Sequence, residues 1–203
     1  MSALRAALDE WSGLWTGLGS PPPETLMRPG LSIEEIRARL SESSLAPCDD
    51  VVDWFSWHDG SALSTWRLPG SALVGVSLAE ALRRRERQWA VSSDLASDGM
   101  FDDSGGVESL YRRQWLPLAR PVGSGGDLVV VLDRQVAHPA VKRLDWADGY
   151  GPVHDIAGSL ADVVGHWIRV LRTGLVRFSA ETNRWERDTG GLPADLHNSD
   201  LIN

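Results

Sequence analysis

The sequence predicts an α+β fold, in which a mostly antiparallel, twisted sheet is flanked by N-terminal and C-terminal helices. Helix signals lie toward both ends of the chain, and most strand-like segments lie between them. Most of these segments are separated by turns too short to hold a crossover helix, which favours antiparallel pairing. The length of 203 residues fits one domain with appendages.

The N-terminal segment predicts a helix over residues 1–18 and a linker over residues 19–30. Leucines and tryptophans between residues 3 and 18 recur at helical spacing and form one apolar stripe. The next segment is rich in proline, which lacks a backbone N–H and disfavours helix in the residue before it. We therefore expect the first helix to be joined to the rest of the chain by an irregular connection.

Three capping boxes predict the start of three further helices. In each box a serine oxygen accepts an N–H of the first turn, and an acidic residue three positions later reaches back. The pairs are Ser32 with Glu35, Ser77 with Glu80, and Ser159 with Asp162. They predict helices over about 33–43, from 78 to about 89, and from 160 to just before Gly174.

A fourth helix is expected directly after Pro47, because Asp49 and Asp50 place negative charge at its N-terminus. It is short and rich in apolar residues, and Asp59-Gly60 is expected to end it.

Segments of β-branched and aromatic residues predict the strands of the sheet. The candidates are 64–68, 73–76, 114–118, 128–132 and 141–146, with a hairpin formed by 175–178 and 184–186. Residues 92–106 are rich in Ser, Asp and Gly and predict an exposed acidic loop.

Composition excludes several classes of protein. The chain has 28 acidic and 20 basic residues and a net charge of −8, which argues against a generic nucleic-acid binder. The single cysteine, Cys48, excludes an internal disulfide and any cysteine-based metal cluster. No basic segment followed by a long apolar one begins the chain, and the longest apolar strand-like run, 128–132, is too short to span a bilayer. We therefore expect a soluble, cytoplasmic protein without contact to a membrane.

No catalytic or metal-binding constellation is evident, so we predict no catalytic residue, no metal and no cofactor. His58-Asp59 could be a metal-binding pair, but Asp-Gly after an apolar helix favours a stop signal. The glycines of 123–126 could cradle a phosphate, but they precede a strand and not a helix, which favours a turn. The basic run 83–87 could touch an acidic partner, yet a solvated helix face is the favoured interpretation.

An ordered series of short motifs resembles the SUKH superfamily, which includes the Smi/Knr-type regulators of fungal cell-wall assembly. The motifs are Pro47 to Gly60, Trp66 to Gly70, Trp115 to Leu118, and Gly126 to Asp133. The resemblance covers residues 31–173 and leaves 174–203 as a C-terminal hairpin and tail. It implies an α+β domain in which the motif residues have structural roles; these are Trp54, His58, Asp59, Gly60, Trp66, Pro69, Gly70, Trp115, Pro117 and Asp133.

The resemblance implies a non-enzymatic protein-binding domain. Bacterial members of this superfamily are predominantly immunity proteins, so the expected partner is a cognate toxin, and the acidic balance favours one with a basic surface. The candidate contacts are the acidic residues near the predicted loop, Asp94, Asp98, Asp102, Asp103 and Glu108.

Other functions remain open at this point. The main alternative is a regulatory scaffold of the Smi/Knr type, and a hydrolase using Asp133, His58 or His154 is a third. The sequence leaves open the oligomeric state, the exposure of Trp57, Trp89 and Trp185, and whether the first helix packs on its own chain.

Overall fold

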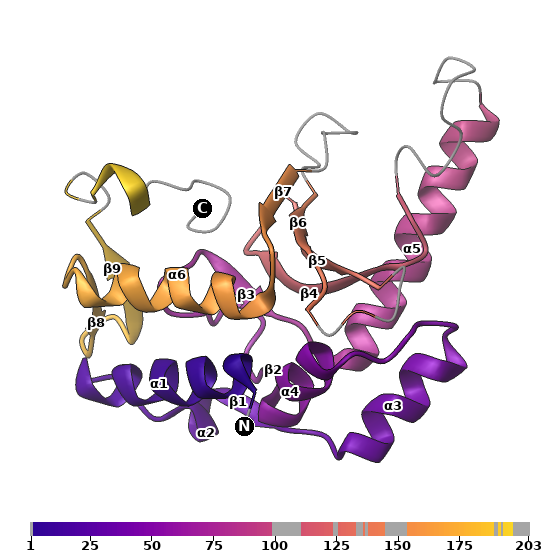
Figure 1. Cartoon of the computed structure of the whole chain (residues 1–203). Helices are drawn as coiled ribbons and strands as arrows, with labels where there is room; N and C mark the ends of the chain where they lie inside the picture. The colour runs from indigo at the N-terminus through magenta and orange to yellow at the C-terminus, as the bar shows by residue number, and fades with distance from the viewer. Residues whose placement is uncertain are drawn as a thin grey trace.

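The computed structural model confirms an α+β fold built on an antiparallel sheet (Figure 1). It describes residues 2–98, 111–123, 126–132, 136, 138–144, 154–188, 191 and 193–196. Five strands form the main sheet in the order β3-β4-β5-β6-β7, and all neighbouring pairs are antiparallel. The strands are β3 (Leu73–Gly75), β4 (Trp115–Pro121), β5 (Leu128–Val131), β6 (Val141–Arg143) and β7 (His154–Ala157).

Helices cover both faces of this sheet. Leu116 and Val130 point into the main core, which also contains side chains of α1 (Ala3–Gly17), α4 (Asp49–Trp57) and α6 (Leu160–Arg172). Their neighbours Trp115 and Val131 point to the opposite face and form a second apolar cluster there. Helix α5 (Leu78–Ser97) packs against β4: its first turns add Leu78 and Ala81 to the main core, and Trp89 packs on the second cluster.

The first helix is part of the core of its own chain. Five indoles from α1, α4 and α6 pack together, and we call them the tryptophan cluster: Trp11, Trp15, Trp54, Trp57 and Trp167. The ring centroids of Trp11 and Trp167 are 5.1 Å apart. The Trp11 indole also donates a hydrogen bond of 3.2 Å to the carbonyl of Pro69. Figure 1 shows α1 and α6 side by side.

The predicted linker is wrong for residues 23–29. They form a short helix, α2 (Pro23–Leu26), and a strand, β1 (Met27–Pro29), which pairs with β2 (His58–Ser61). Proline favours the first turn of a helix, where its missing N–H costs no hydrogen bond, so Pro23 begins α2. The tertiary pairing of β1 with β2 has no local signal in the sequence.

Two other predicted boundaries also differ from the structure. Residues 64–68 form turns and irregular backbone in place of a strand. The helix predicted from 78 to about 89 continues to Ser97. Residues 92–97 of the predicted loop 92–106 are therefore helical, and residues 99–106 lie outside the described part of the chain. Ser and Asp residues there have low helix propensity, but Ser92 is buried, and packing overrides propensity.

The Asp-Gly pair does not cap α4, contrary to the prediction. Helix α4 ends at Trp57, and residues 58–61 are strand β2. Gly60 has φ +76°, and a Cβ there would lie 2.5 Å from the carbonyl carbon of Val76. Glycine is therefore required because two backbone segments touch at this point.

The predicted helix caps and the C-terminal hairpin are confirmed. Serine side chains cap α3 (Ile33–Glu42), α5 and α6 as the capping boxes predict. The C-terminal hairpin consists of β8 (Val176–Ser179) and β9 (Arg184–Arg187), followed by a short 3-10 helix, η3 (Ala194–Leu196). Strand β6 covers 141–143 of the predicted 141–146, and residues 145–146 lie outside the described part of the chain.

Candidate protein-binding surface

Helix α5 projects beyond the edge of the main sheet, so its last turns stand away from the body of the molecule (Figure 1). Its outward residues recur three or four positions apart and form one continuous stripe, which we call the α5 face. The α5 face consists of Arg83, Glu86, Arg87, Ala90, Val91, Asp94, Ser97 and Asp98, all exposed. It is therefore basic near its start, apolar at Ala90 and Val91, and acidic at its end.

The α5 face contains two of the five predicted partner contacts. Asp94 lies in the last turns of the helix, and Asp98 is its C-cap. Because they are four residues apart, their carboxylates are neighbours on the helix surface. The other three candidates, Asp102, Asp103 and Glu108, lie outside the described residues.

These two carboxylates occupy an unfavourable position for helix stability. The C-terminus of a helix carries partial negative charge, which favours basic side chains and disfavours acidic ones. The last turn of α5 contains no basic residue. The acidic end of the α5 face therefore combines two like charges with the helix dipole, and a cationic partner would relieve that repulsion.

Neutralising these carboxylates is expected to stabilise the free protein. The double variant Asp94→Asn/Asp98→Asn should raise the free energy of unfolding by roughly 0.3–1 kcal/mol, because the dipole repulsion is removed. The matched control is Glu34→Gln in the first turn of α3, where the exposed carboxylate favours the helix, so that change should lower stability. Urea unfolding at low salt measures both effects, and a loss of stability in the double variant would contradict this account.

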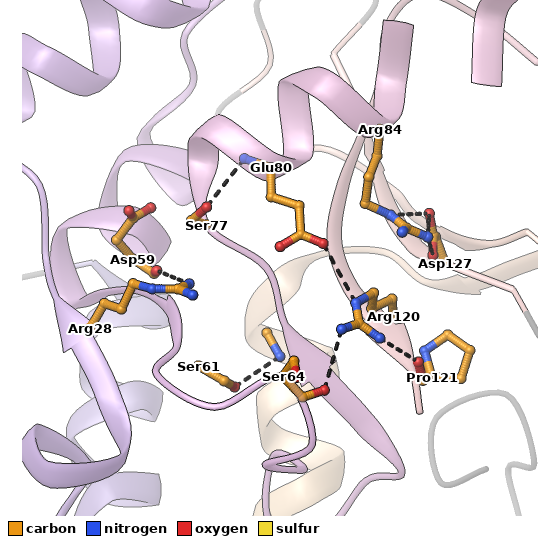
Figure 2. Close-up of polar contacts among 11 residues, drawn as sticks. Arg28, Asp59, Ser61, Ser64, Ser77, Glu80, Arg84, Arg120, Pro121 and Asp127 are labelled. Carbon is orange, nitrogen blue, oxygen red and sulfur yellow. Dashed lines mark hydrogen bonds and ion pairs between the residues drawn. The ribbon is translucent and has the colours of Figure 1, made fainter. Parts of the chain in front are cut away.

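The N-terminus of α5 is fixed by two side-chain oxygens. The Ser77 hydroxyl accepts a hydrogen bond of 3.2 Å from the N–H of Glu80 (Figure 2). The Asp59 carboxylate accepts one of 2.7 Å from the N–H of Leu78. Asp59, which the sequence predicts to end α4, therefore caps α5. Its partner Leu78 is 19 positions away in the sequence, so no local pattern predicts this role.

A buried ion pair holds the middle of α5 against the sheet (Figure 2). The Arg84 guanidinium donates to both carboxylate oxygens of Asp127, at 2.6 Å to Oδ1 and 2.9 Å to Oδ2 through Nη2. The Asp127 side chain is fully buried. Burial raises the pKa of Asp127, and the Arg84 guanidinium opposes that rise.

A second ion pair lies one turn earlier on α5. The Arg120 guanidinium of β4 is 3.5 Å from Glu80, and it also donates 3.3 Å to the carbonyl of Ser64 (Figure 2). Glu80 thus fixes this side of the helix to β4, and Arg84 fixes it to the residue directly before the neighbouring strand β5.

The basic run 83–87 divides between the two sides of α5. Arg83 and Arg87 are exposed, as the solvated-face interpretation predicts, but Arg84 is partly buried and Arg85 is only 4% exposed. Arg85 lies seven residues after Leu78 and four after Ala81, on the apolar stripe of the helix. That spacing is the signal by which its inward orientation could have been predicted.

The second apolar cluster packs against the middle of α5. The Tyr111 hydroxyl donates a hydrogen bond of 2.9 Å to the carbonyl of Trp115, and the two rings are 5.5 Å apart. The Arg113 guanidinium lies 4.6 Å from the centre of the partly buried Trp89 ring. Helix α5 is therefore packed around Trp89, although Ser97 and Asp98 at its C-terminal end are exposed.

Most of the motif residues serve packing or backbone geometry. The His58 ring lies 3.0 Å from the carbonyl of Arg28 on the paired strand, and burial lowers its pKa. Gly70 has φ +83° and lies against the backbone of Trp167. Trp66 packs on Phe178, and Pro117 is a buried residue at an irregularity of β4. Asp133 lies outside the described residues.

The histidines are placed in separate parts of the chain. Within the described residues no three His, Cys, Asp or Glu side chains come close enough to hold a metal ion. His58 and His166 are buried in different elements, and His154 begins β7. Burial raises the pKa of the Cys48 thiol to about 11, so it stays protonated at neutral pH.

One histidine meets a buried acid that sequence analysis did not single out as a site. The Nδ1 atom of His138 lies 3.1 Å from Oδ1 of Asp50, whose side chain is 1% exposed. Oδ2 of Asp50 has no hydrogen-bond partner among the described residues. Burial raises the pKa of Asp50, and His138 opposes the rise.

Asp50→Asn is expected to stabilise the protein at neutral pH. When the pKa of a carboxyl is higher in the folded state than in the unfolded chain, its ionisation destabilises the folded state. The free energy of unfolding therefore falls as the pH rises from the unfolded-state pKa through the folded-state pKa. The variant should match the wild type at pH 3 and be more stable than it at pH 7, because burial raises the pKa of Asp50 in the folded state. Unfolding at several pH values, with the exposed neighbour variant Asp49→Asn as control, measures this difference. A less stable Asp50→Asn at pH 7 would show that the pair with His138 outweighs the cost of burial.

A comparison of the chain with models of known protein families and with curated proteins found no match. In the described part of the chain, no helix combines the length and apolar character that crossing a membrane requires.

Proposed function

We propose that this chain is a non-enzymatic binding protein that neutralises a bacterial polymorphic toxin by occluding it, and that the α5 face contacts the toxin. The observation that carries this proposal is the pair of exposed carboxylates, Asp94 and Asp98, at the negative end of a projecting helix. Such an arrangement weakens the free helix, so it is better explained by a cationic partner than by folding.

The order of charges along the α5 face favours one orientation of the bound partner. Its acidic end attracts a basic surface and raises the rate of encounter. Arg83 and Arg87 at the other end repel that same surface, so the partner is aligned along the helix. Val91, 43% exposed, supplies an apolar contact between the two charged ends.

The class of partner follows from the resemblance to the SUKH superfamily, and the proposal places the protein in the cytoplasm. The net charge of −8 favours a basic protein partner over a nucleic acid. The proposal includes no bond-making step, metal or cofactor.

Capture from the native organism tests the proposal. The wild-type chain, Asp94→Asn/Asp98→Asn and the control Glu34→Gln are used as baits at low salt, and bound proteins are identified. We expect the wild type and the control to retain a basic toxin domain, encoded beside this chain, and the double variant to retain much less.

Growth protection provides the second arm of this test. Co-expression of the wild-type chain with the captured toxin domain should restore growth, and the double variant should protect less. Retention of several cell-wall assembly proteins in place of a toxin would support the regulatory scaffold and contradict the proposal. Equal capture by the wild type and the double variant would exclude the α5 face as the contact.

A further inference from the structure

A pocket lies between residues 65–67, which follow β2, and the C-terminal hairpin. Its cavity has a volume of about 180 Å³. That is room for roughly six water volumes, which suits a small molecule or a single chemical group. The lining residues are Thr65, Trp66, Arg67, Val122, Arg184 and Trp185.

The pocket is cationic although the chain as a whole is acidic. Arg67 and Arg184 are exposed, and in the described part of the chain no carboxylate lies within ion-pair distance of either one. None of the six lining residues is acidic. Arg187, also on β9, has its pKa lowered by burial and by the positive charge of Arg67. An anion in the pocket would offset this repulsion.

The walls of the pocket are aromatic. Trp66, Phe178 and Trp185 form a continuous group, with ring centroids 6.1 Å and 5.7 Å apart. Trp66 is 5% exposed, and the indole N–H groups of Trp66 and Trp185 have no acceptor among the described residues. These two N–H groups are buried, as are those of the core residues Trp15 and Trp115, so what the pocket offers is two indole rings beside two arginines.

We propose that this pocket is a binding site for a small organic anion with a planar apolar part. Arg67 and Arg184 bind the carboxylate or phosphate group, because guanidinium groups form charge-assisted hydrogen bonds with such oxygens. The planar part lies against the indoles of Trp66 and Trp185, whose rings offer flat apolar surfaces. This site is separate from the α5 face, so it stands independently of the toxin-binding proposal.

Titration of the full chain with benzoate tests the proposal, with the indole N–H signals of a ¹H–¹⁵N spectrum as the readout. The signals of Trp66 and Trp185, assigned with Trp66→Phe and Trp185→Phe, should move along a saturable curve. Benzamide has the same shape without the charge and should leave them unchanged. Inorganic phosphate, which has the charge without the ring, should bind more weakly than benzoate.

Arginine variants supply the second arm. Arg67→Gln and Arg184→Gln should each weaken benzoate binding about tenfold, since each removes a charge-assisted hydrogen bond. Arg177→Gln is the matched control, because Arg177 is an exposed arginine of the same hairpin that does not line the pocket. Equal binding of benzoate and benzamide, an unsaturable response, or equal effects of all three arginine variants would overturn the proposal.

Discussion

Arg84→Ala is expected to lower the free energy of unfolding by about 3–5 kcal/mol. The Asp127 carboxylate is fully buried and loses its two-oxygen contact in this variant. The buried carboxylate then keeps only the weaker influence of Arg143 and Arg120, so it must remain poorly compensated or take up a proton, and either outcome disfavours the folded state. Urea unfolding followed by circular dichroism measures the loss.

Two companion variants show whether the effect belongs to the ion pair. Arg83→Ala, one position away on the exposed side of α5, should change stability by less than about 0.5 kcal/mol. Arg84→Ala/Asp127→Ala should cost less than the sum of the two single changes, because no unpaired charge remains. A loss below about 1 kcal/mol in Arg84→Ala would show that the pair does not anchor α5.

Trp11→Ala is expected to lower the free energy of unfolding by about 3–5 kcal/mol, as for other large core residues. Trp11 is fully buried, contacts Trp15, Trp57 and Trp167, and donates a hydrogen bond to Pro69. Truncation leaves a cavity where α1, α4 and α6 meet, and the carbonyl of Pro69 loses its donor.

The form of the unfolding curve tests whether α1 belongs to the same cooperative unit as the sheet. Tryptophan fluorescence and far-ultraviolet circular dichroism should report one coincident transition in both the wild type and Trp11→Ala. Thr16→Ala, an exposed change on the same helix, should leave the midpoint almost unchanged. An earlier fluorescence transition would show that α1 is an appendage.

Features set by neighbours in sequence could be predicted from the sequence. The capping serines Ser32, Ser77 and Ser159 begin their helices because the hydroxyl and its N–H partner are only three residues apart. The turn of the C-terminal hairpin also depends on a few adjacent residues, among them Asn183 with φ 50°.

Features that depend on distant partners could not be predicted in this way. Residues 27–29 form a strand only because residues 58–61 lie beside them. The sequence predicts the end of α5 near residue 89, but the helix continues to Ser97, because the buried environment of Ser92 depends on the tertiary fold.

The candidate sites show the same division. The charge of Asp94 and Asp98 is visible in the sequence, but their common position on a helix face required the extent of α5. Arg84 and Asp127 are 43 residues apart, so nothing local indicates their pairing. The pocket joins Trp66 to Trp185, and only the packing of the hairpin brings these segments together.

The acidic end of the α5 face is expected to attract a basic partner. The most direct measurement is the association rate constant of the captured partner at several ionic strengths, for the wild type and for Asp94→Asn/Asp98→Asn. We predict that the wild-type rate falls steeply with added salt and that the double variant associates at least several-fold more slowly at low salt, with a shallower salt dependence. Identical rates and salt dependences for the two proteins would contradict the claim.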